Sequence, residues 1–185
     1  MFQRLLKRLA RKLDSTKIPY MVIGGQAVLV YGEPRLTKDI DITLGINVDE
    51  LNRIIGVVDA LKLKILVDDY KNFVKETFVL PVMDEKSKIR IDFIFSFSPY
   101  ERQALTRTNN IKLGKDVVKF ASLEDVIIHK IISGRARDLE DIRVVLLKNP
   151  EFNREYIEKW LQEFDLSLCE NFTKIFNELL SDLYI

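Results

Sequence analysis

The sequence predicts an α/β (α+β) fold, with a mixed β-sheet flanked by helices and a helical C-terminal portion. Strand-like runs alternate with short helical segments in the first two thirds of the chain, whereas helical spacing dominates from Ser122 onward. We therefore expect two parts: residues 1–121, with the sheet and an N-terminal amphipathic helix, and residues 122–185, helical and packed on the first part.

The first part begins with a helix, because apolar residues recur at helical spacing from Phe2 to Leu13 and Pro19 then stops it. Alternating or continuous apolar runs bounded by turn residues predict strands after it. Strands are expected at 20–23, 39–44, 78–83, 88–97, 110–112 and 117–120, and helices at 26–31 and from Asn47 or Asp49 to residue 61.

The second part is predicted to contain three or four helices. Ser122 and Asp125 have the spacing of a capping box, with Asp in place of the usual Glu. Interruptions are expected at Gly134, at 149–150 and at 165–167.

Composition restricts the chemistry. With 47% hydrophobic and 31% charged residues, the 185-residue chain can bury a core. One Cys and one His exclude an internal disulfide, a Cys-based zinc site and a His-rich metal site. Catalysis would have to use carboxylates, lysines, arginines and backbone amides.

Charge is uneven, although the net charge is only +1. Residues 1–17 carry six bases and one acid, and residues 151–185 carry eight acids and three bases. The basic side of the first helix either contacts RNA or is simply solvated. We find no run of ~18 apolar residues and no secretory signal, so we expect a cytoplasmic protein without a membrane partner.

The most informative motif is Asp39-Ile40-Asp41-Ile42. On a strand, Asp39 and Asp41 share one face ~6.6 Å apart, while the isoleucines enter the core. Such carboxylates repel each other unless a cation such as Mg²⁺ lies between them. The alternative is an edge strand that shows its acids to solvent.

A second strand, Ile91-Asp92-Phe93, places another acid between core residues. Paired beside the first strand, it would add a third carboxylate to the same face, which is unfavourable without a metal. The alternative is that Asp92 pairs with Arg90 or Lys88. Gly24-Gly25 follows a strand and opens a helix, where backbone amides suit a phosphate. Together these features predict phosphoryl or nucleotidyl transfer.

These motifs resemble the signature of the polymerase-β-like nucleotidyltransferase superfamily. A further stretch resembles the bacterial and archaeal branch that includes the abortive-infection (type IV toxin–antitoxin) nucleotidyltransferase toxins. The matching residues are Gly24 to Ala27, Tyr31-Gly32, Arg35, Thr37, Asp39 to Ile42 and Ile91 to Phe93, and for the second stretch Ala121 to Asp125, Lys130 and Arg137 to Ile142.

The resemblance implies a triphosphate on Gly24 and Gly25, Mg²⁺ (or Mn²⁺) on Asp39 and Asp41, and an attacking hydroxyl activated by Asp92. Many members have Ser where Gly25 stands, so this chain offers only an amide there. The implied acceptors are tRNA or another RNA, or a protein, and the toxin branch implies a cognate antitoxin.

Three basic residues are further candidates for nucleotide binding. Arg35 and Lys38 lie on the loop before the acidic strand and either meet phosphate or are solvated. Lys130 falls within the apolar arc of its helix, so it either reaches the triphosphate or, together with Asp138, anchors the helices to the sheet.

Three functions remain open at this point. The first is a Mg²⁺-dependent nucleotidyltransferase that moves a nucleoside monophosphate from an NTP to an acceptor hydroxyl. The second is a catalytically inactive nucleotide- or partner-binding module of the same fold. The third is a metal-dependent phosphohydrolase that uses the same acids.

Overall fold

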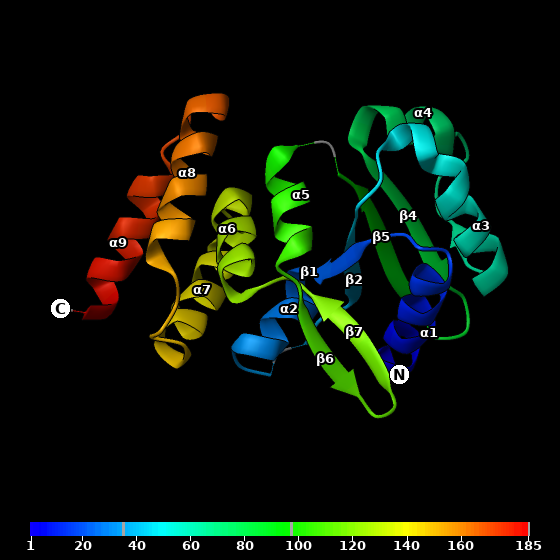
Figure 1. Ribbon diagram of the computed structural model, residues 1–185, viewed down its shortest axis with the longest axis horizontal. Coiled ribbons are helices and arrows are strands. Elements are labelled where there is room, and N and C mark those ends of the chain that lie inside the picture. Colours follow the sequence, from blue (N-terminus) through cyan, green and yellow to red (C-terminus); the bar gives the residue numbers. More distant parts are fainter. Residues whose placement is uncertain (35, 97, 185) are drawn as a thin grey trace. The chain divides into compact units, whose positions relative to one another are not determined.

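The computed structural model describes residues 1–34, 36–96 and 98–184 (Figure 1). The helices are α1 (Phe2–Ser15), α2 (Gly24–Tyr31), α3 (Leu51–Leu61), α4 (Tyr70–Thr77), α5 (Pro99–Thr106), α6 (Leu123–Ser133), α7 (Ala136–Lys148), α8 (Arg154–Leu168) and α9 (Phe172–Tyr184), with a 3₁₀ turn, η1 (Val48–Glu50), before α3. The strands are β1 (Tyr20–Ile23), β2 (Asp39–Leu44), β3 (Lys64–Ile65), β4 (Val79–Asp84), β5 (Ile89–Phe95), β6 (Asn109–Leu113) and β7 (Asp116–Phe120).

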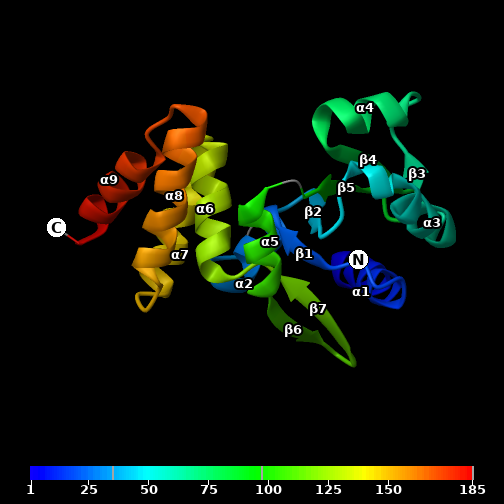
Figure 2. The same ribbon diagram turned by 45° about the horizontal axis from the view of Figure 1, so that its top comes forward.

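The strands of the described ranges form one mixed sheet in the order β3-β4-β5-β2-β1-β7-β6. β2 runs parallel to β5 and β1 parallel to β7, whereas the other neighbours are antiparallel. Figure 2 shows β6 and β7 as a hairpin at one end of this sheet. The predicted α/β class, with a mixed sheet and C-terminal helices, is therefore confirmed.

The chain forms two compact units. The sheet unit consists of Met1–Gln26 and Leu36–Ala121, and the helical unit of Ala27–Arg35 and Ser122–Ile185. This division differs from the predicted parts in one segment, because residues 27–35 group with the C-terminal helices. The residues of α2 after its first turn therefore belong to the helical unit.

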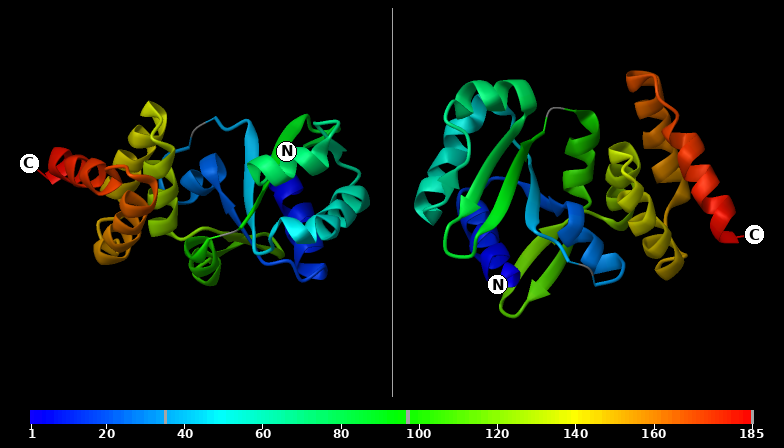
Figure 3. Two further views of the ribbon diagram at one scale, coloured as in Figure 1. Left: turned by 90° about the horizontal axis from the view of Figure 1, so that it is seen from above. Right: turned by 180° about the vertical axis from the view of Figure 1, so that it is seen from behind.

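In the sheet unit, α1 packs on one face of the sheet. Its leucines are buried, as its spacing predicted. Arg8 from the same helix donates to Asp84 of β4 at 3.0 Å and to the carbonyl oxygen of Leu61 at the end of α3. Asp84 pairs with Ile89 and therefore shares its face of the sheet. Figures 1 and 3 give opposite views of these strands.

The sheet unit contains β3, α4 and α5, which the sequence did not predict. α4 buries only Val74, so its apolar pattern is weak. α5 begins with a capping box, in which Ser98 accepts from the backbone of Glu101 and the Glu101 side chain accepts from the backbone of Ser98. The predicted strand 88–97 is shorter in the structure, where β5 ends at Phe95, and Phe97 lies outside the described residues.

In the helical unit, α6, α7, α8 and α9 enclose an apolar interior that includes Ile131, Leu146 and Phe176. The predicted break at 165–167 is wrong, because α8 continues to Leu168 and ends at Cys169 in the left-handed conformation. No helix in the described ranges combines the length and the apolar content needed to cross a bilayer.

Candidate active site

The three predicted acids lie on one face of the sheet. β2 and β5 pair in parallel register, with Asp41 directly opposite Asp92 and Asp39 opposite Arg90. Ile40 and Ile42 are fully buried on the other face. The two-residue period of the strands therefore separates the carboxylates from the core, as the sequence predicted.

Gly24 lies against the carboxylate of Asp41. Its φ is +63°, and a Cβ placed on it would lie 1.9 Å from Oδ2 of Asp41. Both the backbone conformation and this close approach require glycine. Gly25 is buried in the first turn of α2, next to Gly24. The predicted glycine turn and the predicted acidic strand are therefore in direct contact.

A buried hydrogen bond ties the glycine turn to the loop before the acidic strand. Nε2 of Gln26 donates to Oγ1 of Thr37 at 2.5 Å, and both side chains are buried. Thr37 lies two residues before Asp39, so this bond helps to fix where β2 begins. Neither residue was predicted to have a role, although both occur in the motif that carried the resemblance.

Arg90 contacts the acidic face through Asp92. Its Nε donates to Oδ1 of Asp92 at 2.8 Å, and this hydrogen bond is the main cause that raises the pKa of Arg90. Burial opposes the rise, and attraction to Asp92, Asp39 and Asp41 adds to it. The alternative prediction that Asp92 pairs with Arg90 is therefore confirmed.

The acids have the chemistry that a divalent cation requires, since carboxylate oxygens on adjacent strands are typical ligands of Mg²⁺. Within residues 1–34, 36–96 and 98–184, however, no three His, Cys, Asp or Glu side chains converge closely enough to hold a metal ion together. Arg90 contacts one oxygen of the Asp92 carboxylate. The assignment of Asp39, Asp41 and Asp92 as metal ligands stays a prediction.

The acidic face of β2 also carries the hydroxyl of Thr43. Thr43 follows Asp41 by two residues and is 1% exposed. Among the described residues, its Oγ1 has no hydrogen-bond partner. The residues of β2 on this face are therefore polar along its length.

The basic residues of the preceding loop were predicted to meet phosphate. Lys38 is exposed, one residue before Asp39. Arg35 lies outside the described residues. Nucleotide binding by both residues stays a prediction.

Lys130 lies in a buried ionic cluster of the helical unit. Its Nζ forms ion pairs with Asp138 and, at 3.0 Å, with Asp141. All three residues are at most 8% exposed. The predicted interruption at Gly134 is confirmed, because α6 ends at Ser133, Gly134 has φ +63° and α7 begins at Ala136. The acids reach Lys130 from this second helix.

The buried carboxyl of Asp138 is stabilised as an anion. Burial raises its pKa, but hydrogen bonds from Lys130, Ser133 and Arg135 lower it more, so the pKa lies below its ordinary value. These contacts tie α6 to α7, so Lys130 has a structural role there. Anchoring of the helices to the sheet by Lys130 and Asp138 stays a prediction. Contact between Lys130 and a triphosphate stays a prediction.

The basic side of α1 is largely engaged within the sheet unit. Arg8 pairs with Asp84, and Arg11 pairs with Asp116 at 2.5 Å. Arg4 lines a cavity of about 310 Å³ near the N-terminus. Binding of RNA by this helix stays a prediction.

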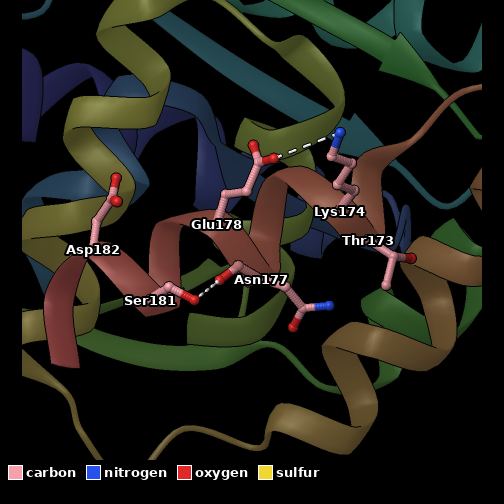
Figure 4. Close-up of a pocket in the computed structure, with 6 residues that line it drawn as sticks. All are labelled: Thr173, Lys174, Asn177, Glu178, Ser181 and Asp182. Carbon is pink, nitrogen blue, oxygen red and sulfur yellow. Dashed lines mark hydrogen bonds and ion pairs between the residues drawn. The ribbon is translucent and has the colours of Figure 1, made fainter. Parts of the chain in front are cut away.

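A second hollow, of about 600 Å³, lies along α9 (Figure 4). Its lining residues all come from this one helix: Thr173, Lys174, Asn177, Glu178, Ser181 and Asp182. Lys174 and Glu178, one turn apart, form an ion pair along the helix. The hollow shares no residue with the predicted site.

Comparisons with known proteins agree with the fold. The model of a family described as nucleotidyltransferases of unknown function (DUF6036) matches residues 1–179. No curated protein shows significant similarity to the sequence.

Several solved structures are similar at low identity. A solution structure of the antibiotic-resistance factor ANT(2'')-Ia has a TM-score of 0.61 and 15% identity, covering 90% of this chain and 92% of that one. A crystal structure of ANT(2'')-Ia with adenylyl-2''-tobramycin has a TM-score of 0.60 and 14% identity, covering 90% of this chain and 98% of that one. A nucleotidyltransferase structure from Thermotoga maritima has a TM-score of 0.53 and 16% identity, covering 88% of this chain and 93% of that one. At these identities, the likeness concerns the fold.

Proposed function

Because the chain belongs to the nucleotidyltransferase family whose model matches residues 1–179, we propose that it transfers a nucleoside monophosphate from an NTP to an acceptor hydroxyl. The predicted nucleotidyltransferase family is thereby confirmed and agrees with the polymerase-β-like motifs, whereas the toxin branch stays a prediction. The observation that carries the proposal is the contact between Gly24 and Asp41. It brings a helix N-terminus suited to phosphate next to carboxylates suited to a divalent cation.

In this proposal, the first amides of α2, at Gly24 and Gly25, receive the triphosphate, because the first N–H groups of a helix lack intrahelical acceptors. Lys38 and Arg35 add positive charge from the loop. Lys130 would have to exchange an ion pair with Asp138 or Asp141 for a phosphate oxygen. Among the proposed phosphate contacts, that of Lys130 therefore costs the most free energy, because a buried ion pair must be broken.

Asp39, Asp41 and Asp92 would hold Mg²⁺, or Mn²⁺ in its place. When bound, the cation offsets the negative charge of the phosphoryl oxygens and of the leaving pyrophosphate. Asp92 takes the proton of the acceptor hydroxyl. The hydroxyl oxygen forms a bond to the α-phosphorus, and the bond from that phosphorus to the bridging oxygen of pyrophosphate breaks. The glycine turn and the acidic strand keep the reacting groups aligned.

The acceptor is a hydroxyl of an RNA 3′ end, such as that of tRNA, or of a protein side chain. The complex of ANT(2'')-Ia with adenylyl-2''-tobramycin adds a small polyhydroxylated acceptor to those worth testing. If the toxin resemblance extends to function, a cognate antitoxin would suppress the transfer.

The proposal is tested with NTPs labelled at the α-phosphate, Mg²⁺, and total RNA, the protein alone or an aminoglycoside. We expect labelled acceptor and an equal amount of pyrophosphate. Asp41→Asn should reduce the transfer at least a hundredfold, whereas Asp59→Asn, which changes an exposed acid of α3, should leave it unchanged. Release of phosphate without labelled acceptor would instead identify a phosphohydrolase.

A second candidate is a nucleotide-binding module without turnover. It is favoured by the ion pair of Arg90 with Asp92, which occupies the proposed base. An NTP that raises the melting temperature together with Mg²⁺, without labelling any acceptor, would support it.

A further inference from the structure

The acidic face concentrates negative charge in a small area. Asp41 and Asp92 are direct neighbours on β2 and β5, and Asp39 lies two residues before Asp41 on β2. Neighbouring strands lie ~4.8 Å apart, so these carboxylates repel one another unless a cation is close.

Arg90 occupies the position that can relieve this repulsion. It is directly opposite Asp39 and two residues before Asp92, so its side chain leaves the same face as all three acids. Its Nε is 2.8 Å from Oδ1 of Asp92.

The exposure of the pair allows it to open. The side chain of Arg90 is 52% exposed, whereas that of Asp92 is 18% exposed. The guanidinium can therefore move into water at little cost, and Asp92 would remain on the strand. A divalent cation on these acids would share the Asp92 carboxylate with Arg90, and its charge repels that of Arg90.

We propose that Arg90 is the internal counter-cation of the acidic face and competes with a divalent cation for Asp39, Asp41 and Asp92. This inference rests on the proposed function. Without the metal, Arg90 offsets the repulsion among the acids. Metal binding displaces it, so part of the binding free energy is used to break the ion pair.

Binding of Mn²⁺ to the full-length protein, followed by the EPR signal of free Mn²⁺, tests the competition. Arg90→Gln removes the charge and should tighten Mn²⁺ binding by about 1.5- to fivefold, the range expected from breaking an exposed ion pair. Arg90→Lys keeps the charge and should bind like the wild type. Arg11→Gln breaks an exposed pair with Asp116 in the same unit and is the matched control, with unchanged binding.

Stability of the metal-free protein gives a second readout. Arg90→Gln should lower its melting temperature more than Arg11→Gln does, and saturating Mn²⁺ should remove the difference. A merely structural role for Arg90 predicts the opposite change in affinity, because a disordered site binds metal more weakly.

Each outcome separates this inference from the proposed function. If the wild type binds Mn²⁺ and Arg90→Gln binds it equally or more weakly, the competition is refuted and the proposed metal site stands. If only Arg90→Gln binds Mn²⁺, the competition is supported. If neither protein binds Mn²⁺, both the competition and the metal-dependent function are refuted.

Discussion

Replacing Gly24 by Ala tests the contact between the glycine turn and the acidic strand. At φ +63°, Ala costs about 1–2 kcal/mol more than Gly. The new Cβ would also lie 1.9 Å from Oδ2 of Asp41, far inside van der Waals contact. Moving the Asp41 carboxylate aside should cost a further ~1–3 kcal/mol, as for other overpacked sites. We expect the free energy of unfolding to fall by about 2–5 kcal/mol.

Gly114→Ala is the matched control for the free-energy cost of placing Ala at a positive φ. Gly114 has φ +65° and belongs to the same unit, but a Cβ there meets only the end of the Lys7 side chain, at 3.3 Å. Its substitution should cost about 1–2 kcal/mol. The difference between the two variants, from urea denaturation curves, measures the contact with Asp41.

A double-mutant cycle completes the test. In an Asp41→Ala background, the carboxylate is gone and only the Cβ of residue 41 remains close, at 3.2 Å, so Gly24→Ala should cost little more than Gly114→Ala. The expected coupling is about 1–3 kcal/mol. Equal costs of Gly24→Ala with and without the Asp41 carboxylate would refute the close approach.

Two further predictions concern the ionic cluster of the helical unit. Lys130→Met leaves two buried carboxylates without Lys130 and should lower the free energy of unfolding, measured by urea denaturation, by about 3–5 kcal/mol. Lys174→Met breaks an exposed ion pair and should change the same free energy by less than about 0.5 kcal/mol. Because the folded-state pKa of Asp138 lies below 3.8, its contribution to stability is complete above that pH and is lost as the pH falls through the lower folded value. The wild type should therefore lose stability below about pH 4 more steeply than Asp138→Asn, and equal slopes in denaturation curves from pH 2.5 to 7 would contradict this.

The parts of the fold that the sequence predicted are those with strong periodicity. The alternation of Asp39 to Ile42 predicted a strand with acids on one face, and the leucines of α1 predicted its buried side. The pairing of this strand with Asp92 was also predicted, because both strands placed an acid between core residues, and the register confirms it.

The missed elements had local signals that periodicity does not measure. α5 starts with Ser98-Pro99 and Glu101, a capping sequence that signals the start of a helix without any apolar periodicity. The break predicted near Asp165 is wrong because that side chain accepts hydrogen bonds from the backbone of Phe172 and Thr173. Asp165 therefore caps the start of α9 although it lies within α8. In the sequence alone, an acid of this kind looks like the end of a helix.

The site itself was predictable only in part. Residue spacing placed the acids on one face, but the choice between a metal and Arg90 as their partner depends on side-chain rotamers. The bond between Gln26 and Thr37 joins residues eleven positions apart through a loop whose path the sequence does not specify. Folding of the loop brings them together.

The register between β2 and β5 also limits how this gene can change. Substitutions in either strand alter one side chain at a time, but loss or gain of a single codon within β2 would turn Asp41 toward the core and an isoleucine toward the site. The tight turn at residues 85–88 lies outside this pairing, so its length can vary without moving the acids. Descendants of this chain should therefore differ in turn length while keeping the spacing of Asp39 and Asp41.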